Sequence, residues 1–471
     1  MTKVTTTNYD LLVLGGGSAG FAAAIRASEL GATVGLIEGG TLGGTCVNVG
    51  CVPSKTLLRA AEAQYARSHH GFDGVPSSDG LPDWPSVRRG KDELVTRLRQ
   101  ERYQDVLASY PAIHLIRDTA RVERGPAVTL ESGRPLHAPK LVVATGSAPW
   151  AAPIPGLEDA GYLDSTAVME LKERPSTLVV IGGGSVGLEL AQMFARLGTA
   201  VTVVEREPAI LPGEDPEIGA ELCRHLVVEG LTVRAGVTIE RVERNGEYRI
   251  IADGEAGRQV LTASELLVAT GRRPRTSGLG LESAGVGLGA TGEIMVDEFL
   301  QTSSSGIYAA GDALGDPMYV YVAAYAGAVA AENAVGGDRR KYELVAVPRV
   351  TFTDPAVASV GHTLQEARAA GHQAIQSRLP IAYLARAAAA RDPRGFVTLV
   401  ADQKTRRILG AQIVAREAGE MITEPTLAIR HHLTIDDLTT AFHPYLTLSE
   451  GIRLAAQGFD RDVDKLSCCA S

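Results

Sequence analysis

The five cysteines of this 471-residue chain are unevenly spaced, which suggests redox or metal chemistry rather than a disulfide scaffold. Four residues separate Cys46 from Cys51, too many for a regular helical pair one turn apart. Gly50 and Pro53 can permit the distorted turn that brings the two sulfur atoms together. A pair of this kind can pass two electrons as it changes between dithiol and disulfide. Cys223 has the surroundings of an ordinary helix residue.

Two further cysteines, Cys468 and Cys469, are adjacent in the sequence. Neighbouring Cα atoms are about 3.8 Å apart, which is shorter than an unstrained disulfide prefers, so we expect two thiols here. Two soft thiolates are suitable ligands for a soft metal ion. The alternative interpretation is an accidental pair of cysteines without a function.

A strand, a glycine turn and a helix near the N-terminus are the first elements that could position this chemistry. An apolar strand leads into the turn, a helix is predicted over residues 21–30, and a second strand ends at Glu38. Gly15 permits the tight turn, Gly17 lets the backbone approach a pyrophosphate, and Gly20 lets helix and strand pack closely. Glu38 can accept hydrogen bonds from an adenosine ribose.

The same pattern recurs later in the chain. A strand over residues 177–181 precedes Gly182, Gly184 and Gly187, and a second strand ends at Glu205. Two complete units imply two dinucleotides, and the economical assignment is FAD for one and a nicotinamide cofactor for the other. The alternative is one functional unit and one decayed copy.

Three short segments extend the dinucleotide pattern. Two apolar strands end in Ala-Thr-Gly, one at Thr145 and Gly146 and the other at Gly271. A third strand ends at Gly311 and Asp312, where the acid can reach a hydroxyl group of the flavin ribityl chain; taken alone, this is an ordinary turn. Together they indicate an FAD domain that is interrupted by a nicotinamide domain.

Length and composition limit the classes of protein that need to be considered. The chain is long enough for about three domains, and it has no uncharged apolar run near the ~20 residues that span a bilayer. The net charge of -9 and the scattered basic residues argue against nucleic-acid binding. The N-terminus lacks the features of a secretory signal, so we expect a cytoplasmic protein.

Residues 43–55 read Gly-Gly-Thr-Cys-Val-Asn-Val-Gly-Cys-Val-Pro-Ser-Lys. With this motif, and from Tyr9 to its last residue, the chain resembles the pyridine nucleotide-disulfide oxidoreductases. The resemblance implies that Cys51 lies against the flavin as the electron-transfer thiolate and that Cys46 is the outer, attacking thiol. It also implies that Thr45 belongs to the FAD site.

The resemblance assigns a partner to Lys55, which stands one helical turn after the second cysteine. In the family a lysine at this position pairs with a glutamate of the nicotinamide domain, which here is Glu189. Such a pair would favour negative charge on the reduced flavin and on the thiolate. The alternative is a surface salt bridge without consequence.

The fold that the resemblance implies is α/β, with two Rossmann-like dinucleotide-binding domains and a C-terminal α+β dimerisation domain. The expected boundaries are 1–150 for the first part of the FAD-binding domain, 151–270 for the NAD(P)-binding domain, 271–345 for the second FAD-binding part, and 346–471 for the interface domain with its Cys-Cys tail.

The segment before the tail departs from the disulfide-reducing members of the family. Those members have an acid–base histidine in a His-Pro-x-x-Ser-Glu-type motif. Aligned on Ser449 and Glu450, the histidine position holds Tyr445, and a neutral tyrosine with a reference pKa of ~10 is a poor proton shuttle. Alignment on His443 would restore the histidine but displace the Ser-Glu pair.

Tyr445 and the two tail cysteines are similar to the mercury(II)-reducing members of the family, and Tyr103 matches a second tyrosine of their site. A tyrosine on an amphipathic helix is otherwise a packing residue. The resemblance implies that Cys468 and Cys469 of one subunit capture Hg(II) and pass it by thiol exchange to the redox pair of the other, where it becomes Hg(0). This mechanism requires a homodimer and Hg(II)-thiol complexes as substrate.

The preferred nicotinamide donor is ambiguous from the sequence. Glu205 is typical of NAD users because it repels a 2′-phosphate, whereas Arg206 could bind that phosphate. The resemblance implies NADPH as the donor. Glu205 makes the use of NADH more plausible than is usual in the family.

Two alternatives remain open from the sequence. One is a dihydrolipoamide dehydrogenase or glutathione-type disulfide reductase that uses His443. The other is a thiol protein that sequesters metal and whose flavin is vestigial.

Overall fold

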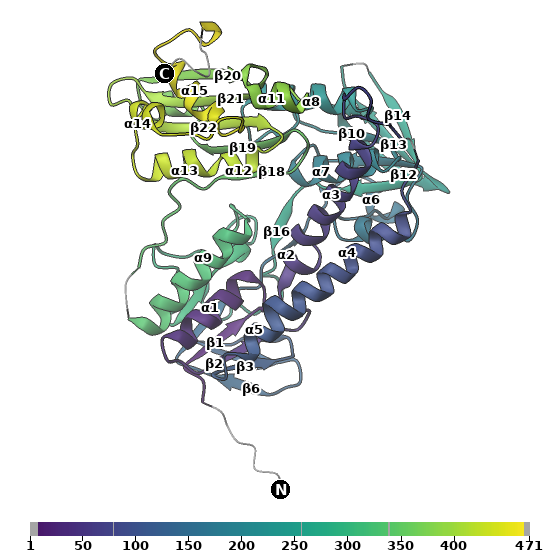
Figure 1. Cartoon of the computed structure of the whole chain (residues 1–471). Helices are drawn as coiled ribbons and strands as arrows, with labels where there is room; N and C mark the ends of the chain where they lie inside the picture. Colours follow the sequence, from purple (N-terminus) through teal and green to yellow (C-terminus); the bar gives the residue numbers. More distant parts are fainter. Residues whose placement is uncertain (1–7, 79, 256, 338–339, 466–471) are drawn as a thin grey trace. The chain divides into compact units, whose positions relative to one another are not determined.

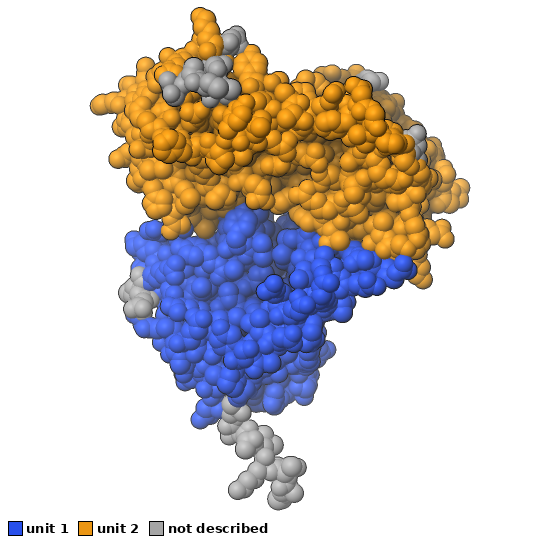
Figure 2. All heavy atoms as spheres, viewed as in Figure 1, with its two compact units in different colours: residues 1–54, 88–150, 271–343 blue, residues 55–87, 151–270, 344–471 orange. Residues whose placement is uncertain are grey.

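The computed structural model describes residues 8–78, 80–255, 257–337 and 340–465, so Cys468 and Cys469 lie outside the described residues. The chain divides into two compact units, which are coloured separately in Figure 2. Unit 1 consists of residues 1–54, 88–150 and 271–343, and unit 2 consists of residues 55–87, 151–270 and 344–471.

Unit 1 is built on a five-stranded parallel sheet with the strand order β17-β7-β1-β2-β3. The strands are β1 (Leu11–Leu14), β2 (Val34–Ile37), β3 (Ile113–Ile116), β7 (Lys140–Val143) and β17 (Ile307–Ala309). Strands β1 and β2 are buried along their whole length, as expected for central strands of a parallel sheet.

Helices α1 (Ser18–Glu29) and α9 (Val320–Ala331) pack closely against each other in this unit (Figure 1). A side chain on Gly327 would lie 2.0 Å from the carbonyl oxygen of Ala19, so the close approach depends on small residues.

Unit 1 also contains further helices, two of which carry the cysteine motif. They include α2 (Gly44–Asn48), the start of α3 (Cys51–Ala66), most of α4 (Trp84–Arg99), the π-helix η1 (Gln100–Gln104), α5 (Asp105–Ala108), η3 (Gly311–Leu314) and η4 (Glu332–Gly336). The smaller sheets are β4 (Ala120–Val122), β5 (Ala127–Leu130) and β6 (Pro135–His137), and the pair β8 (Ser147–Pro149) and β16 (Arg272–Pro274).

Unit 2 contains a second parallel sheet, with the order β11-β10-β9-β15. Its strands are β9 (Thr177–Ile181), β10 (Ala200–Val204), β11 (Thr232–Arg234) and β15 (Glu265–Val268), with helices α7 (Ser185–Arg196) and α8 (Pro216–Val228). An antiparallel sheet of β12 (Thr238–Asn245), β13 (Glu247–Asp253) and β14 (Gln259–Ala263) accompanies it, with α6 (Leu157–Ala160) and η2 (Ala167–Glu170).

The C-terminal part of unit 2 is an antiparallel sheet with the order β18-β19-β22-β21-β20. The strands are β18 (Arg349–Thr351), β19 (Ala356–Gly361), β20 (Ala374–Pro380), β21 (Phe396–Asp402) and β22 (Ile408–Ala415). The helices are α10 (Leu364–Ala369), η5 (Ile381–Tyr383), α11 (Ala385–Ala390), α12 (Ala418–Met421), α13 (Thr423–Arg430), α14 (Ile435–Thr440), α15 (Glu450–Gln457) and η6 (Val463–Lys465).

The two parallel sheets and the C-terminal antiparallel sheet confirm the predicted α/β class with an α+β C-terminal part. The predicted helix over 21–30 begins earlier, because Ser18 to Gly20 of the glycine turn already have helical conformation. Within the described ranges, no helix is long and apolar enough to cross a membrane.

Candidate functional site

The first glycine turn lies where β1 ends and α1 begins. Gly15 has a φ of 107°, and a Cβ there would lie 2.3 Å from the carbonyl oxygen of Ala144. A Cβ on Gly20 would lie 1.8 Å from the carbonyl oxygen of Gly15, so helix and turn approach too closely for a side chain. Gly17 is the N-cap of this 12-residue helix and has no side chain that could cap it. The N–H groups of the first turn are therefore available to an anion such as a pyrophosphate.

Glu38 lies directly after β2 and beside this turn. Its carboxylate accepts hydrogen bonds from the backbone N–H groups of Gly16 at 2.7 Å and Gly40 at 2.6 Å. The two bonds fix the orientation of the carboxylate and leave each oxygen able to accept a further bond, as from a ribose hydroxyl group.

The second glycine turn, between β9 and α7 in unit 2, repeats the geometry of the first. Gly182 has a φ of 113°, and a Cβ on Gly187 would lie 2.1 Å from the carbonyl oxygen of Gly182. The N-cap Gly184 faces open space. Both turns therefore have the close helix approach and open N-terminus that a dinucleotide pyrophosphate requires.

The acid of the second unit is held in the same way as that of the first. Glu205 is buried, and it accepts hydrogen bonds from the N–H groups of Gly183 at 2.6 Å and Glu207 at 2.8 Å. Arg206 is exposed and forms an ion pair of 2.8 Å with Glu207. The guanidinium is accessible, but an acid already lies beside it.

A polar cluster in unit 1 fits a cofactor at the ends of β7 and β17. The hydroxyl oxygen of Thr145 is buried and has no hydrogen-bond partner among the described residues. Asp312 accepts a hydrogen bond of 2.7 Å from the Ser147 hydroxyl group, which in turn accepts one of 2.8 Å from Arg272. An orphaned hydroxyl and an oriented carboxylate are groups that a bound flavin nucleotide can satisfy.

The three glycines of this region have left-handed backbone conformations. The φ angles are 71° at Gly146, 131° at Gly271 and 72° at Gly311. Side chains are disfavoured at such angles. Nothing among the described residues lies within 4 Å of an added Cβ at Gly146 or Gly271, so the backbone is uncovered there, whereas Gly311 packs against Ala19.

Cys46 and Cys51 lie on two successive helices that are separated by two non-helical residues, 49 and 50. Cys46 is in α2, and Cys51 is the first residue of α3. Val49, with a φ of -140°, ends α2 and permits the predicted distorted turn. Thr45 lies next to the first cysteine, and its carbonyl oxygen accepts a bond of 2.9 Å from the N–H of Val49. Both cysteines are half-buried thiols.

Asn48 stands between the two cysteines and was missed by the sequence analysis. Its side-chain amide donates hydrogen bonds to the carbonyl oxygens of Leu42 at 3.1 Å and Gly44 at 2.8 Å. Its Oδ1 accepts a bond of 3.3 Å from Arg99 on α4. An asparagine between the two cysteines could have indicated this role, because its side chain readily forms hydrogen bonds with backbone groups where a helix is interrupted.

Tyr103 lies near both cysteines, on the π-helix η1. Its ring packs against Phe21, with 4.8 Å between the centroids. Burial raises the pKa of Tyr103 above its usual range, a hydrogen bond with Ser18 opposes the rise, and the nearby charges of Cys46 and Cys51 add to it. The hydroxyl group is therefore neutral at ordinary pH and can act as a hydrogen-bond donor.

Lys55 and Glu189 form an ion pair within unit 2. The Lys55 Nζ is 2.6 Å from the Glu189 Oε2, and the glutamate side chain is only 6% exposed. The second glutamate oxygen accepts a bond of 2.9 Å from the N–H of Phe352, and the Phe352 ring lies 4.6 Å from the lysine nitrogen. The glutamate of the pair is thus buried and oriented, whereas the lysine side chain is 33% exposed.

In the segment between α14 and α15, Tyr445 is exposed, whereas the side chain of His443 is only 5% exposed. The His443 Nε2 is 2.9 Å from Glu424, and its Nδ1 is 3.1 Å from the carbonyl oxygen of Ala441. The hydrogen bond with Glu424 raises the pKa of His443, while burial opposes the rise. Cys223 lies half-buried on α8, where burial raises the pKa of its thiol.

No group of three or more metal-binding side chains occurs within residues 8–78, 80–255, 257–337 and 340–465. The predicted metal-capturing pair, Cys468 and Cys469, falls after the last described residue.

Comparisons with known proteins agree with this geometry. Residues 9–327 match the family model described as pyridine nucleotide-disulphide oxidoreductase, and residues 347–456 match the model of the dimerisation domain of the same family. The chain therefore belongs to the pyridine nucleotide-disulphide oxidoreductases.

Among curated relatives, the chain is 45% identical to a mercuric reductase of Staphylococcus aureus, over 98% of this chain and 84% of that protein. It is 46% identical to a mercuric reductase of Streptomyces lividans, over 98% and 99% of the two chains. A solved structure titled as the Cu(II) complex of the HOCl-induced flavoprotein disulfide reductase RclA of Escherichia coli is 29% identical, with a TM-score of 0.84 over 94% of this chain and 98% of that chain.

These matches support FAD and a pyridine nucleotide as cofactors of an oxidoreductase. The dimerisation domain supports a homodimer.

Proposed function

We propose that this oxidoreductase reduces Hg(II) to Hg(0) with electrons from a nicotinamide dinucleotide. The observation that carries the proposal is the 45% and 46% identity to mercuric reductases across almost the whole chain. FAD, when bound, supplies hydride acceptance and two-electron transfer to a disulfide. The first glycine turn with Glu38, Thr145 and Asp312 suits FAD, and the second turn suits the nicotinamide dinucleotide.

Cys46 and Cys51 would act as the dithiol that binds and reduces the metal ion. Cys51 begins a 16-residue helix, and the partial positive charge of a helix N-terminus favours a thiolate over a thiol. Two sulfur atoms then ligate Hg(II), which suits a soft ion. Two electrons convert the ion to Hg(0), which no longer holds thiolates and leaves.

Tyr103 would orient the thiolates or the metal ion that they bind. Its hydroxyl group stays protonated because burial raises its pKa, so it can donate a hydrogen bond to a sulfur atom during turnover. Lys55 and Glu189 would place an oriented charge pair one turn along the helix that begins at Cys51.

Delivery of the metal is proposed to involve two subunits. Cys468 and Cys469 of one subunit would capture Hg(II) and pass it to the redox pair of the partner subunit, with Tyr445 near the point of transfer. Each exchange replaces one thiolate by another, so the ion is never released to water.

We propose NADPH as the preferred donor, with NADH also used. The accessible Arg206 can meet a 2′-phosphate, whereas the carboxylate of Glu205 is engaged with backbone N–H groups and can also receive an unmodified ribose. Arg206→Ala should raise the KM for NADPH several-fold and leave the KM for NADH nearly unchanged.

An anaerobic acceptor assay tests the proposed function. NADPH oxidation is followed with Hg(II) plus excess thiol, with lipoamide, and with oxidised glutathione, for the wild type and for the double variant Cys468→Ala/Cys469→Ala. We expect turnover with Hg(II) only, and a loss in the double variant. Turnover of lipoamide that the double variant retains would instead assign the chain to the disulfide reductases, which could use His443 and Glu424.

A further inference from the structure

Four polar side chains lie along one face of α7, at Ser185, Glu189, Gln192 and Arg196. Their spacings of four, three and four residues place them on a single stripe of the helix. Glu189 and Gln192 are buried, and the Arg196 side chain is only 4% exposed. Burial of such groups costs free energy unless they are hydrogen-bonded, so their partners indicate what the stripe serves.

All four side chains bind the segment 351–354, which leads from β18 towards β19 (Figure 1). Gln192 makes the central contact. Its amide oxygen accepts a hydrogen bond of 2.8 Å from the Asp354 N–H, and its amide nitrogen donates one of 2.8 Å to the Asp354 carbonyl oxygen. One side chain therefore fixes both backbone groups of Asp354. The other contacts join Ser185 to Thr351 at 2.7 Å, Glu189 to the Phe352 N–H at 2.9 Å, and Arg196 to the Asp354 carboxylate at 3.0 Å.

Glu189 connects this segment to Lys55. One of its carboxylate oxygens accepts a hydrogen bond from the Phe352 N–H, and the other lies 2.6 Å from the Lys55 Nζ. The N–H group therefore fixes which oxygen faces the lysine. Because Asp354 follows Phe352 by two residues, Gln192 holds the stretch of backbone that orients the glutamate.

Arg196 holds α3 at a second point, in addition to Lys55. Its guanidinium carbon lies 4.3 Å from the centre of the Tyr65 ring, and its nitrogen atoms bind Glu229 at 2.6 Å and 2.8 Å. Tyr65 is the last residue but one of α3, whereas Lys55 lies in the second turn of that helix. The stripe therefore contacts α3 near both ends. Since Cys51 is the first residue of α3, Lys55 stands one turn after it, on the same side of the helix.

We propose that Gln192 and Arg196 are positioning residues for the redox pair. By holding α3 and the segment 352–354, they keep Lys55 in a fixed place one turn from Cys51. A fixed lysine stabilises a thiolate at Cys51, and a stabilised thiolate favours the dithiol form of the pair over the disulfide. A lysine released from Glu189 would extend towards solvent instead, since its side chain is already 33% exposed. The proposal deepens the proposed function, on which it rests, because these residues set how readily the redox pair accepts electrons.

The redox potential of the Cys46–Cys51 couple tests this role. The FAD-loaded dimer is equilibrated with mixtures of reduced and oxidised dithiothreitol. Alkylation and mass spectrometry then show what fraction of the two cysteines is dithiol and what fraction is disulfide. Gln192→Leu removes both bonds to Asp354. We expect it to shift the equilibrium about tenfold towards the disulfide, which is a fall of about 30 mV in the potential of this two-electron couple.

Gln412→Leu is the matched control for this variant. Gln412 is a buried glutamine of β22 in the same unit, and its amide donates a hydrogen bond of 3.2 Å to the His362 carbonyl oxygen. The control removes a similar bond and leaves the stripe on α7 intact, so the potential should not change. An equal shift in both variants, or no shift in Gln192→Leu, would overturn the proposal.

A double variant shows whether Gln192 acts through the lysine. Lys55→Met removes the charge and should shift the equilibrium at least as far towards the disulfide as Gln192→Leu does. Gln192→Leu added to Lys55→Met should cause no further shift, because the residue that Gln192 positions has lost its charge. Additive shifts would contradict the positioning role.

Arg196→Lys extends the test to a milder change, which answers the question even if Gln192→Leu does not fold. The lysine keeps the charge but loses the planar fork that binds two acids. We expect a shift of several-fold in the same direction. Arg406→Lys is the control, since Arg406 also binds two acids in the same unit. Equal shifts in these two variants would refute the role of Arg196.

The measurement requires neither Hg(II) nor NADPH, so this proposal and the proposed function can fail separately. An unchanged potential in Gln192→Leu and in Arg196→Lys refutes the positioning role alone. A wild-type dimer that oxidises no NADPH with Hg(II) refutes the proposed function, whatever the potentials of the variants are.

Discussion

The hydroxyl group of Tyr103 is the residue-scale feature that most directly connects the structure to metal chemistry. Its pKa is raised chiefly by burial and also by the charges of both cysteines, while a hydrogen bond with Ser18 opposes the rise. We expect Tyr103→Phe to lower kcat for Hg(II) about tenfold, because a hydrogen bond to a charged sulfur is lost. Flavin reduction by NADPH, measured by stopped flow, should be unchanged.

Tyr110→Phe is the matched control for this variant, since Tyr110 is a partly buried tyrosine of the same unit. An equal loss of kcat in both variants would mean that Tyr103 acts only through packing.

His443 and Glu424 make a pH-dependent contribution to stability. The folded protein raises the pKa of His443, so the contribution is complete below the unfolded pKa of about 6.5 and is lost as pH rises through the folded value. Glu424→Gln should therefore lower the free energy of unfolding more at pH 5.5 than at pH 9. Urea titrations at the two pH values measure this difference, and an equal loss at both would contradict the ion pair.

The types and spacing of the cysteines pointed to redox or metal chemistry, whereas Lys55, Tyr103 and Tyr445 were expected from the resemblance to the family. The role of Asn48 could not be read in the same way, since its partners are backbone carbonyl groups and Arg99, about fifty positions away. Nor could the sequence show that His443 meets Glu424, because that contact depends on how α13 and the loop before α15 pack.

At the scale of elements, the role of the second glycine turn in coenzyme binding can be tested by a substitution that adds one methyl group. A Cβ on Gly187 would lie 2.1 Å from the carbonyl oxygen of Gly182, so Gly187→Ala should push α7 away from the turn. We expect NADPH binding at least tenfold weaker, with FAD retained. Gly213→Ala is the control, because nothing lies within 4 Å of its added Cβ. Unchanged NADPH binding in Gly187→Ala would remove this turn from the coenzyme site.

The strand–turn–helix units were predictable because their signals are local. Strands β9 and β10 match the apolar runs that define them, and the helices begin inside the glycine turns. The contacts that the polar side chains of α7 make could not be predicted from the sequence. Glu189, Gln192 and Arg196 all contact the segment 352–354, more than 150 residues later, and such contacts leave no periodic signal in either segment.

At the scale of the whole molecule, the central prediction is that one active site uses two chains. A chain with Cys46→Ser/Cys51→Ser lacks the redox pair, and a chain with Cys468→Ala/Cys469→Ala lacks the capturing pair. A purified heterodimer of the two should recover about half of the wild-type rate, because one of its two sites is complete. Each homodimer measures the background, and a heterodimer no faster than the homodimers would mean that the tail serves its own subunit.

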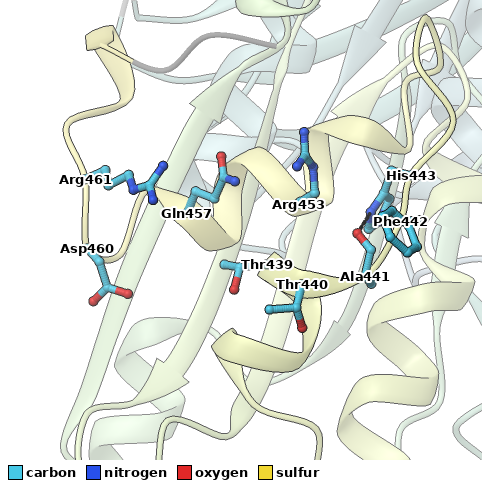
Figure 3. A pocket seen from close by; sticks show the side chains of 9 residues that line it. All are labelled: Thr439, Thr440, Ala441, Phe442, His443, Arg453, Gln457, Asp460 and Arg461. Atoms are coloured by element: carbon cyan, nitrogen blue, oxygen red, sulfur yellow. Dashed lines mark hydrogen bonds between the residues drawn. The ribbon is translucent and has the colours of Figure 1, made fainter. Parts of the chain in front are cut away.

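At this scale the two repeated glycine units predicted two dinucleotide-binding regions, and the dimerisation domain, which the family model matches at residues 347–456, was expected from the resemblance to the family. What the sequence could not supply is a cavity in the C-terminal part of unit 2 (Figure 3), because its lining brings together α14, residues 441–443, α15 and the turn after α15, and the packing of these elements leaves no local signal.

The central claim is that electrons from NADPH leave the protein through Cys46 and Cys51 to Hg(II). The most direct measurement is the anaerobic stoichiometry of elemental mercury released per NADPH oxidised, for the wild type and for Cys46→Ser. The account predicts one Hg(0) per NADPH for the wild type and none for the variant, in which NADPH still reduces the flavin. NADPH oxidation without release of Hg(0), or undiminished release from Cys46→Ser, would contradict it.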